Sequence, residues 1–319
     1  MDSRTPIKEI ARKAGVSEVT ARARLRKLEQ DVGLRYVLEL EPMRAGLHFR
    51  YFIAAKLKRR PEKEELAHLL GCSIVPQFAA LCEGQFDLFI YVAALSHIDA
   101  MRWQYSFRSA LEEELVSWRM SHILLERQGL FPLKNELLNA LPLQHPQPKL
   151  LAVLNENSRA PLTEIARKTG IELSTVQYHF NRMVRSGLIK RFTAVMEKPP
   201  KSCLIANFLT YTYGKRHQAM SEAARRLMRN EEPFQPLNTH LVVAESSGAY
   251  DGFFLGSFRD ADEGYRHVRE IERTFEGTLA MDSAIMADVV LGLPPFRSMD
   301  VELSYDDTDW TQSPRRRTA

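Results

Sequence analysis

A short stretch of residues occurs twice in this chain. Residues 5–15 read TPIKEIARKAG, and residues 160–170 read APLTEIARKTG. The two copies share a proline, the run Glu-Ile-Ala-Arg-Lys and a closing glycine, in the same order. An internal repeat constrains the architecture before any other feature, because each copy must form the same kind of structural unit. The length of 319 residues suits about two domains, or two copies of a compound unit.

The similarity continues into the segment that follows each copy. Three apolar residues recur there at i, i+4 and i+7, namely Ala21, Leu25 and Leu28 in the first copy and Val176, Phe180 and Met183 in the second. This spacing predicts an amphipathic helix, and Ser17 is well placed to cap the first one. A shorter helix is expected before each, over 7–14 and 162–169, with a turn at Gly15 or Gly170. Two short helices joined by a glycine-containing turn are typical of a helix-turn-helix unit.

The outer face of each longer helix carries polar and cationic side chains that suit DNA. Long cations match phosphates and guanine edges, and amides match adenine. The candidate DNA-binding residues are Thr20, Arg22, Arg24, Arg26 and Lys27 in the first copy, and Thr175, Gln177, Tyr178, His179 and Arg182 in the second, with Asn181 and Arg185 beside them. The alternative is a packed helical hairpin whose charges are only solvated surface.

A segment rich in expected strands follows each helical unit. After the first we expect strands at 50–59, 73–84, 86–95 and 116–127, with helices at 61–71 and about 99–115. After the second we expect strands at 203–214, 240–248, 251–258 and 281–292, with helices at 217–229 and 260–276. The order β-α-β-β-α-β occurs twice, which indicates the ferredoxin-like arrangement of a sheet under two helices.

The remaining segments join or follow these units. Residues 131–147 contain several prolines and one short apolar helix, so they are interpreted as a linker of flexible span. Residues 294–319 lack apolar periodicity, are acidic and then end near Arg315–Arg317, so they are interpreted as a disordered tail. The predicted domains are therefore 1–46, 47–130, 148–198 and 199–293, which alternate between helix-turn-helix and ferredoxin-like units.

Composition limits the other possibilities. The net charge of +4 permits a nucleic-acid partner without requiring one. No apolar run reaches the roughly 20 residues that span a bilayer, and three isolated cysteines fit a reducing cytoplasm. The nine histidines have no metal-ligand spacing, and the nucleotide-binding and hydrolase glycine motifs are absent. We therefore expect no metal, no cofactor and no membrane partner.

Helix-turn-helix followed by β-α-β-β-α-β resembles the Lrp/AsnC (feast/famine) family of transcriptional regulators, here in tandem duplication. The resemblance spans about 3–292 and includes Gly15-Val16-Ser17 in the first copy and Ser174-Thr175-Val176 in the second. It implies an α+β fold with two winged helix-turn-helix units, each followed by a ferredoxin-like domain of the RAM type. It also implies double-stranded DNA as partner and an amino-acid-like effector.

The family's Gly-x-aromatic-Asp turn between the second and third strands also occurs twice. The resemblance makes Gly84, Phe86 and Asp87, and Gly248, Tyr250 and Asp251, candidate effector-binding residues. Small residues around Tyr250 are expected to leave room for a ligand and to expose backbone N–H groups. An ordinary hairpin turn would explain the same residues, because glycine supplies a positive φ there.

Two departures from the family pattern distinguish the copies. In that family the DNA-reading helix-turn-helix unit, which we call the reader, begins with a helix like the one expected at 148–155. The first copy lacks this helix, because Met1 stands where it would already have ended. An upstream start, a wall from elsewhere in the chain or a weakened reader would each explain this. The second departure is Glu172, which replaces the Ser17 cap and would repel phosphate. The two readers are therefore expected to recognise different sequences.

Two functions remain open. The first is a sequence-specific DNA-binding regulator, with or without gating by a small-molecule effector, which is not an enzyme. The alternative is an enzyme like the siroheme decarboxylases of haem biosynthesis, which resemble Lrp/AsnC proteins and work as paired non-identical halves. In either case the two sheet domains are expected to pack together as an intramolecular pseudo-dimer, from which larger homo-oligomers could form.

Overall fold

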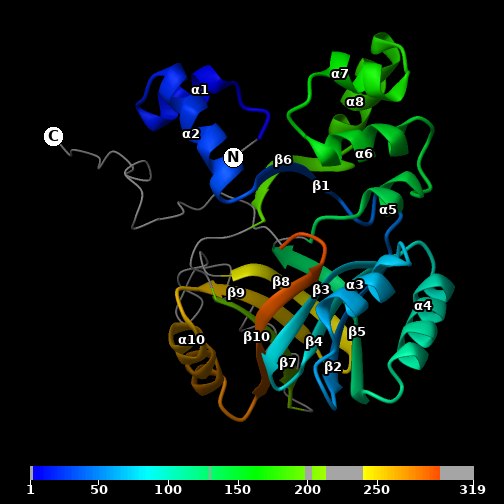
Figure 1. The fold of residues 1–319 in the computed structure, drawn as a ribbon, viewed down its shortest axis with the longest axis vertical. Helices are drawn as coiled ribbons and strands as arrows, with labels where there is room; N and C mark the ends of the chain where they lie inside the picture. Colours follow the sequence, from blue (N-terminus) through cyan, green and yellow to red (C-terminus); the bar gives the residue numbers. More distant parts are fainter. Residues whose placement is uncertain (1–2, 129–130, 198–202, 213–239, 295–319) are drawn as a thin grey trace.

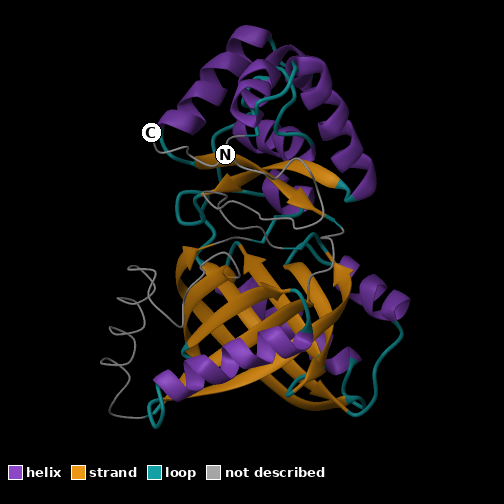
Figure 2. Cartoon of the chain, turned by 90° about the vertical axis from the view of Figure 1, so that its left-hand side faces the viewer, coloured by secondary structure: helices purple, strands orange, loops and turns teal. Residues whose placement is uncertain are grey.

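The structure is a computed structural model that describes residues 3–128, 131–197, 203–212 and 240–294. It has two layers along its long axis (Figures 1 and 2). A β-barrel forms the lower layer, and the helix-turn-helix units form the upper layer above a small two-stranded sheet. The helix expected at 217–229 and the tail from 295 onward lie outside the described residues.

Eight strands form the closed barrel. They are β2 (Phe49–Leu57), β3 (Pro76–Gly84), β4 (Leu88–Ala94), β5 (Leu115–Gln128), β7 (Cys203–Tyr211), β8 (His240–Gly248), β9 (Gly252–Phe258) and β10 (Leu279–Leu291). The order around the barrel is β10-β3-β4-β2-β5-β8-β9-β7, and all neighbours are antiparallel. Each half of this order is the strand order of a ferredoxin-like sheet, so the duplicated fold class is confirmed.

The two sheets are joined along both of their edges. β5 of the first unit pairs with β8 of the second, and β10 of the second pairs with β3 of the first. An open sheet edge leaves unpaired backbone N–H and C=O groups, and closing the barrel removes both edges from each unit. The predicted packing of the two sheet units against each other is therefore present, in the form of one continuous barrel.

Aromatic side chains from both units fill the barrel. The rings of Phe52 and Phe253, one from each unit, have centroids 4.2 Å apart. Phe89 stacks on Phe253 at 5.1 Å, and Phe208 packs against Phe89 at 6.0 Å. All four side chains are almost completely buried. Because aromatic side chains bury large apolar areas, this shared core makes each sheet unit depend on the other.

Helices cover the outer faces of the sheets. α3 (Lys63–Gly71) and α4 (His97–Ala110) pack on the first sheet, and α10 (Ala261–Thr274) packs on the second (Figure 1). Among the helices that the structure describes, none is long and apolar enough to cross a membrane.

The upper layer contains the two repeated helical units. The first consists of α1 (Ile7–Ala14) and α2 (Glu18–Asp31), and the second of α6 (Gln147–Glu156), α7 (Leu162–Thr169) and α8 (Leu173–Arg185). Each is followed by a strand, β1 (Leu34–Leu40) or β6 (Ile189–Met196). β1 and β6 pair with each other antiparallel, so the two helical units are joined by a shared sheet.

The segment 131–147 does not behave as a flexible linker. It contains α5 (Asn135–Asn139), and its apolar side chains Phe131, Leu137, Leu138 and Leu141 are buried in the main core. Phe131 stacks on Tyr91 of the barrel with ring centroids 4.8 Å apart. The expectation of a flexible span, which was based on the prolines, was wrong here. The apolar residues between the prolines are buried and hold the segment in place between the barrel and the upper layer.

Candidate nucleic-acid interface

The start of α2 is built as its sequence predicts. Gly15 adopts a left-handed conformation with φ +65°, which ends α1 and lets the chain turn. Ser17 then caps α2, because its Oγ accepts the backbone N–H of Thr20 at 3.1 Å. The predicted cap is confirmed, and the geometry places α2 after α1 as the longer helix of a helix-turn-helix pair.

The second unit repeats this turn without the cap. Gly170 is left-handed with φ +70°, as Gly15 is. Glu172 occupies the N-cap position of α8 and makes no capping hydrogen bond through its side chain. The two longer helices therefore begin with different chemistry at the end that carries the free backbone N–H groups.

Most of the candidate DNA-binding side chains lie on the outside of the upper layer. On α2, Arg22, Arg26 and Lys27 are exposed, and Thr20 and Arg24 are half-buried. On α8, Gln177, Tyr178 and Arg182 are exposed, and Thr175 is half-buried. Tyr178 is 60% exposed although it is aromatic. Arg182 also donates a hydrogen bond to Gln144 Oε1 at 2.7 Å, so the segment before α6 positions it.

His179 is an exception, and its predicted place on the outer face was wrong. Its side chain is only 7% exposed, and its ring contacts Tyr178 edge-on with centroids 5.0 Å apart. Burial lowers the pKa of His179, and the nearby charges of Arg182 and His145 act in the same direction. A ring that is 7% exposed is not presented to a phosphate, so His179 supports α8 from behind its outer face.

The two readers differ strongly in how well they are packed. In the second, Leu150, Leu151 and Leu154 of α6 are buried together with Ile165, Val176 and Met183 of α7 and α8. In the first, only the small residues Ala11 and Ala21 of α1 and α2 are buried. Among the described residues, no helix takes the place of α6 in the first reader, as the sequence comparison predicted.

Instead, the start of the chain attaches the first reader to the second. Arg4 Nη1 donates to the backbone oxygens of Ser158, at 2.7 Å, and Ala160, at 3.1 Å. Its guanidinium also lies 5.1 Å from the ring centroid of Phe180 and 5.4 Å from that of Phe192. A guanidinium suits such a site, because it can donate several hydrogen bonds and stack on aromatic faces at the same time.

A buried charge cluster lies where the upper layer meets the barrel. Glu39 of β1 is 2% exposed and pairs with Lys190 at 3.0 Å and with Arg191, both on β6. Below it, Arg50 of β2 pairs with Glu126 of β5. Burial raises the pKa of Glu126, and the charge of Arg50 opposes that rise. Such pairs hold a fixed geometry, because an unpaired buried charge is costly.

The first candidate effector turn is a packed strand connection. Gly84 has φ +149°, and a Cβ there would lie 2.6 Å from the backbone oxygen of Ser283 on the opposing strand β10. Asp87 Oδ2 accepts the backbone N–H of Leu57 at 2.8 Å, and Oδ1 pairs with Lys56. Phe86 is buried. The close approach of β10 explains why residue 84 is a glycine, and the hydrogen bond from Leu57 explains why residue 87 is an aspartate.

The second turn repeats this arrangement on the other side of the barrel. A Cβ on Gly248 would lie 2.7 Å from the backbone oxygen of Met120 on β5. Asp251 Oδ2 accepts the backbone N–H of Tyr211 at 2.9 Å. The two glycines and the two aspartates therefore occupy equivalent places in the two units.

The expectation of open space around Tyr250 was wrong. Its side chain is 3% exposed, its backbone N–H donates to Ser121 Oγ at 2.8 Å, and its hydroxyl donates to Asp282 at 2.7 Å. Arg119 donates to the same hydroxyl at 3.1 Å. Burial, together with the hydrogen bond to Asp282, raises the pKa of Tyr250 to about 12. The small residues beside it are needed because β5 passes close by.

Comparison with known proteins agrees with the helical units. Residues 1–29 match the AsnC-type helix-turn-helix domain, and residues 147–190 match a winged helix-turn-helix DNA-binding family. A helix-turn-helix transcriptional regulator of Pyrococcus abyssi is 25% identical over 44% of this chain and 83% of its own length. The regulator FL11 of Pyrococcus furiosus is 32% identical over 32% of this chain and 62% of its own length.

Among solved structures, the siroheme decarboxylase NirDL resembles the whole arrangement. It superposes with a TM-score of 0.60 and 13% identity, over 91% of this chain and 87% of NirDL. Its complex with an iron-uroporphyrin III analogue gives a TM-score of 0.58 over 90% of this chain. At this identity the likeness describes the fold, two helix-turn-helix units above a joined pair of sheets, and not the chemistry.

Proposed function

We infer that this chain, which carries one AsnC-type and one winged helix-turn-helix unit, is a DNA-binding transcriptional regulator of the Lrp/AsnC type. One observation carries the inference. The shared β1–β6 sheet holds both readers on the side of the molecule away from the barrel, with the cationic faces of α2 and α8 exposed (Figure 1). A chain that contains both readers in fixed relation can contact two segments of one duplex without a partner subunit.

The charge distribution supports contact with the phosphate backbone. Arg22, Arg26 and Lys27 on α2 and Arg182 and Arg185 on α8 are exposed cations on the helices that follow the turn. Each phosphate that such a cation neutralises releases a counterion, so binding weakens as salt rises. Exposed Gln177 and Asn181 can hydrogen-bond to base edges, which is the part of the contact that depends on sequence.

The two readers are proposed to recognise different half-sites. Their outer faces share few side chains, and only α2 has a serine cap at its N-terminus. In a symmetric dimer the two half-sites mirror each other. A tandem chain with diverged readers is expected to select an asymmetric operator, that is, one whose two half-sites differ in sequence. Such operators are expected in a limited set of promoters.

The test is a genome-wide selection of DNA fragments by the purified full-length chain, followed by fluorescence anisotropy on the best duplex. The variant Arg22→Ala/Arg26→Ala is compared with Arg182→Ala/Arg185→Ala, and Arg108→Gln, an exposed position on α4 in the barrel layer, serves as control. Each pair should make the negative slope of log affinity against log salt less steep by about 1.8, since each lost phosphate contact removes about 0.9. Unchanged affinity and slope in both pairs would contradict the proposal.

The full-length likeness to NirDL keeps a siroheme decarboxylase-like enzyme as a second candidate. The described barrel interior is filled by the aromatic core of Phe52, Phe89, Phe208 and Phe253, which favours a structural role for the barrel. Mixing the purified chain with iron-uroporphyrin III and separating free ligand by gel filtration tests the candidate. Co-elution of strong blue-violet absorption with the protein, together with loss of DNA binding, would favour the enzyme.

A further inference from the structure

The outer faces of α2 and α8 can be compared position by position, because the two repeats align without a gap at an offset of 155 residues. In this alignment the buried Ala21 of α2 is equivalent to the buried Val176 of α8. Positions one, two and five residues further along each helix lie more than a quarter turn away from this buried residue. They are Arg22 and Gln177, Ala23 and Tyr178, and Arg26 and Asn181, and all six are exposed.

Two other positions do not distinguish the readers. Arg24 and His179 are equivalent, but Arg24 is half-buried and His179 is 7% exposed, so this position points toward the rest of the reader. Lys27 and Arg182 are also equivalent, and both are exposed cations. A position that carries a cation in both readers gives them the same chemistry there. The three exposed pairs, in contrast, differ in chemistry from one reader to the other.

The polar groups at these positions are available to bind a base. Among the described residues, neither Arg22 nor Arg26 forms an ion pair or a side-chain hydrogen bond. The side-chain amides at 177 and 181 have no partner in that part of the chain either. Glu29 follows Arg26 by three residues, but its carboxylate accepts a hydrogen bond from the hydroxyl of Tyr36 at 2.7 Å and forms no ion pair with Arg26. Both faces therefore present their hydrogen-bonding groups to a ligand.

We propose that the first reader recognises guanines and the second recognises adenines, so that the operator has one G·C-rich and one A·T-rich half-site. The guanidinium groups of Arg22 and Arg26 each donate two hydrogen bonds, to O6 and N7 of a guanine. The amides of Gln177 and Asn181 each donate to N7 of an adenine and accept from its N6 amino group. An arginine has no acceptor for that amino group, so the two readers cannot exchange half-sites.

The third pair and the place of these residues on their helices support the same assignment. Arg22 and Gln177 lie in the second turn of their helices, and the N-terminal part of the second helix in such a unit contacts base edges. Tyr178 is 60% exposed and can cover the methyl group of thymine, the partner of adenine. The small Ala23 replaces it in the first reader. The arginines also lie in the field of the phosphates, so they contribute to salt dependence as well.

The inference rests on the proposed DNA-binding function and adds the bases of each half-site. Selection from a random duplex library by the purified full-length chain tests it, together with two exchange variants. Arg22→Gln/Arg26→Asn gives the first reader the side chains of the second, and Gln177→Arg/Asn181→Arg does the reverse. The parent chain should select one guanine-containing and one adenine-containing half-site. Each variant should change the bases of one half-site and keep those of the other, with the fold intact by circular dichroism.

Modified bases test the contacts on the parent chain alone. 7-Deazaguanine and 7-deazaadenine lack N7 and still form their base pairs, so each removes one acceptor of the proposed contact. Fluorescence anisotropy on the selected duplex should show at least about fivefold weaker binding for each replacement.

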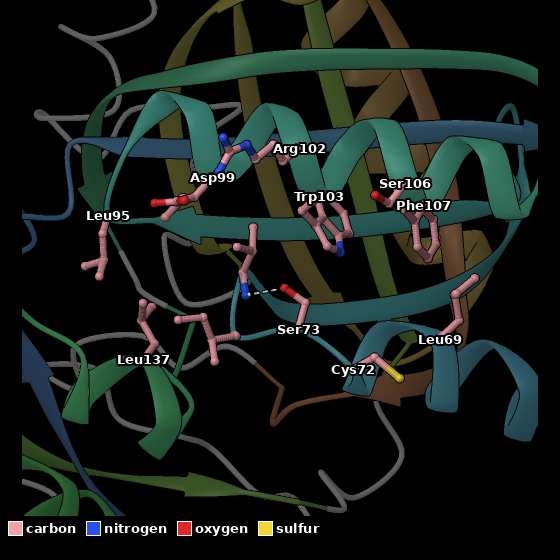
Figure 3. A pocket seen from close by; sticks show the side chains of 13 residues that line it. Leu69, Cys72, Ser73, Leu95, Asp99, Arg102, Trp103, Ser106, Phe107 and Leu137 are labelled. Carbon is pink, nitrogen blue, oxygen red and sulfur yellow. Dashed lines mark hydrogen bonds between the residues drawn. The ribbon is translucent and has the colours of Figure 1, made fainter.

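Two single variants serve as controls for the exchange variants. Lys27→Gln should weaken binding to every duplex by the same factor and leave the selected bases unchanged, as expected for a phosphate contact. Arg102→Gln replaces an exposed arginine that lines a groove on α4 in the barrel layer, away from both readers (Figure 3). It should bind DNA as the parent chain does.

The outcomes separate this inference from the function on which it rests. If the parent chain enriches no duplex, the regulator function and the inference are both wrong. If it enriches duplexes whose two half-sites have the same base composition, the function stands and the inference alone is wrong. An exchange variant that binds DNA and keeps the parent's bases in both half-sites would also overturn it. So would equal affinity of the parent chain for the natural duplex and for both deaza duplexes, whatever the exchange variants do.

Discussion

The two copies of the repeat have matching structures in the barrel and different structures in the upper layer. In the barrel the two copies are equivalent: β5 pairs with β8 as β10 pairs with β3, and Asp87 and Asp251 accept equivalent backbone N–H groups. In the upper layer the copies differ: within the described ranges, the second reader has α6 and a buried leucine core, and the first reader has neither. Closing the barrel requires the same strand geometry at both seams between the two units. A reader needs only a neighbouring surface that holds its helices in place, and that surface can differ between the two copies.

The difference implies that the two readers are held in place in different ways. The second reader is continuous with the main core through α5 and α6, and the first reader attaches to it through β1 and Arg4. The first reader therefore gains order from its neighbour and not from a core of its own. Regions with few buried apolar contacts open at lower free energy, so the first reader should be the more dynamic of the two.

The largest expected effect is a loss of stability when the second reader's core is cut. Leu151→Ala removes a completely buried side chain of α6 and should lower the free energy of unfolding by about 2–5 kcal/mol. Leu28→Ala, at a half-buried position of α2, should cost about 1 kcal/mol or less. Urea denaturation followed by circular dichroism measures both. Equal losses would mean that the two readers are packed alike.

The next effect tests the equivalence of the barrel halves. Asp87→Ala and Asp251→Ala each leave a backbone N–H without its acceptor, that of Leu57 or of Tyr211. Each should cost about 1–3 kcal/mol. Thermal unfolding of the two variants side by side gives the comparison, with Asp99→Asn as a carboxylate change outside the barrel turns. A large loss in one and none in the other would break the equivalence.

A smaller effect concerns the attachment of the first reader. Arg4→Gln removes the stacking on Phe180 and Phe192 and weakens the bonds to Ser158 and Ala160. Amide hydrogen exchange in α1 and α2 should then speed up several-fold, while exchange in α7 and α8 changes little. Lys13→Gln, which removes only the exposed pair with Glu9, is the matched control. Faster exchange in both readers would indicate that Arg4 stabilises the whole upper layer.

The smallest effect is a pH dependence from the second reader. Burial lowers the pKa of His179 in the folded chain, so the unfolded chain binds a proton more readily. Stability from this residue is present above the usual histidine pKa of about 6.5 and is lost as pH falls through and below it. In His179→Gln, part of the acid destabilisation between neutral and mildly acidic pH should disappear. Parallel curves for the parent chain and the variant would refute this role.

Much of this architecture follows from local sequence. The bounds of α1 and α7, the Ser17 cap, the missing cap at Glu172 and the succession of strands and helices along the first sheet unit are readable because they depend on residues within a few positions of each other. The helix-turn-helix assignment belongs to this group. The shorter strands and α4, which ends at Ala110, differ from the expected bounds by a few residues, because hydrogen bonding sets an element's end more than periodicity does.

Only the tertiary structure decides how distant segments use their side chains. His179 has the sequence of an outward residue and is buried; Leu137 lies among prolines and becomes part of the core; Tyr250 has small neighbours because β5 passes beside it. Edge pairing between β5 and β8 or β10 and β3 leaves no periodic signal, since any strand edge offers the same backbone groups. The sequence alone therefore determined the repeated units and the side chains available for their surface, and tertiary packing decided which of those side chains face solvent and which are buried.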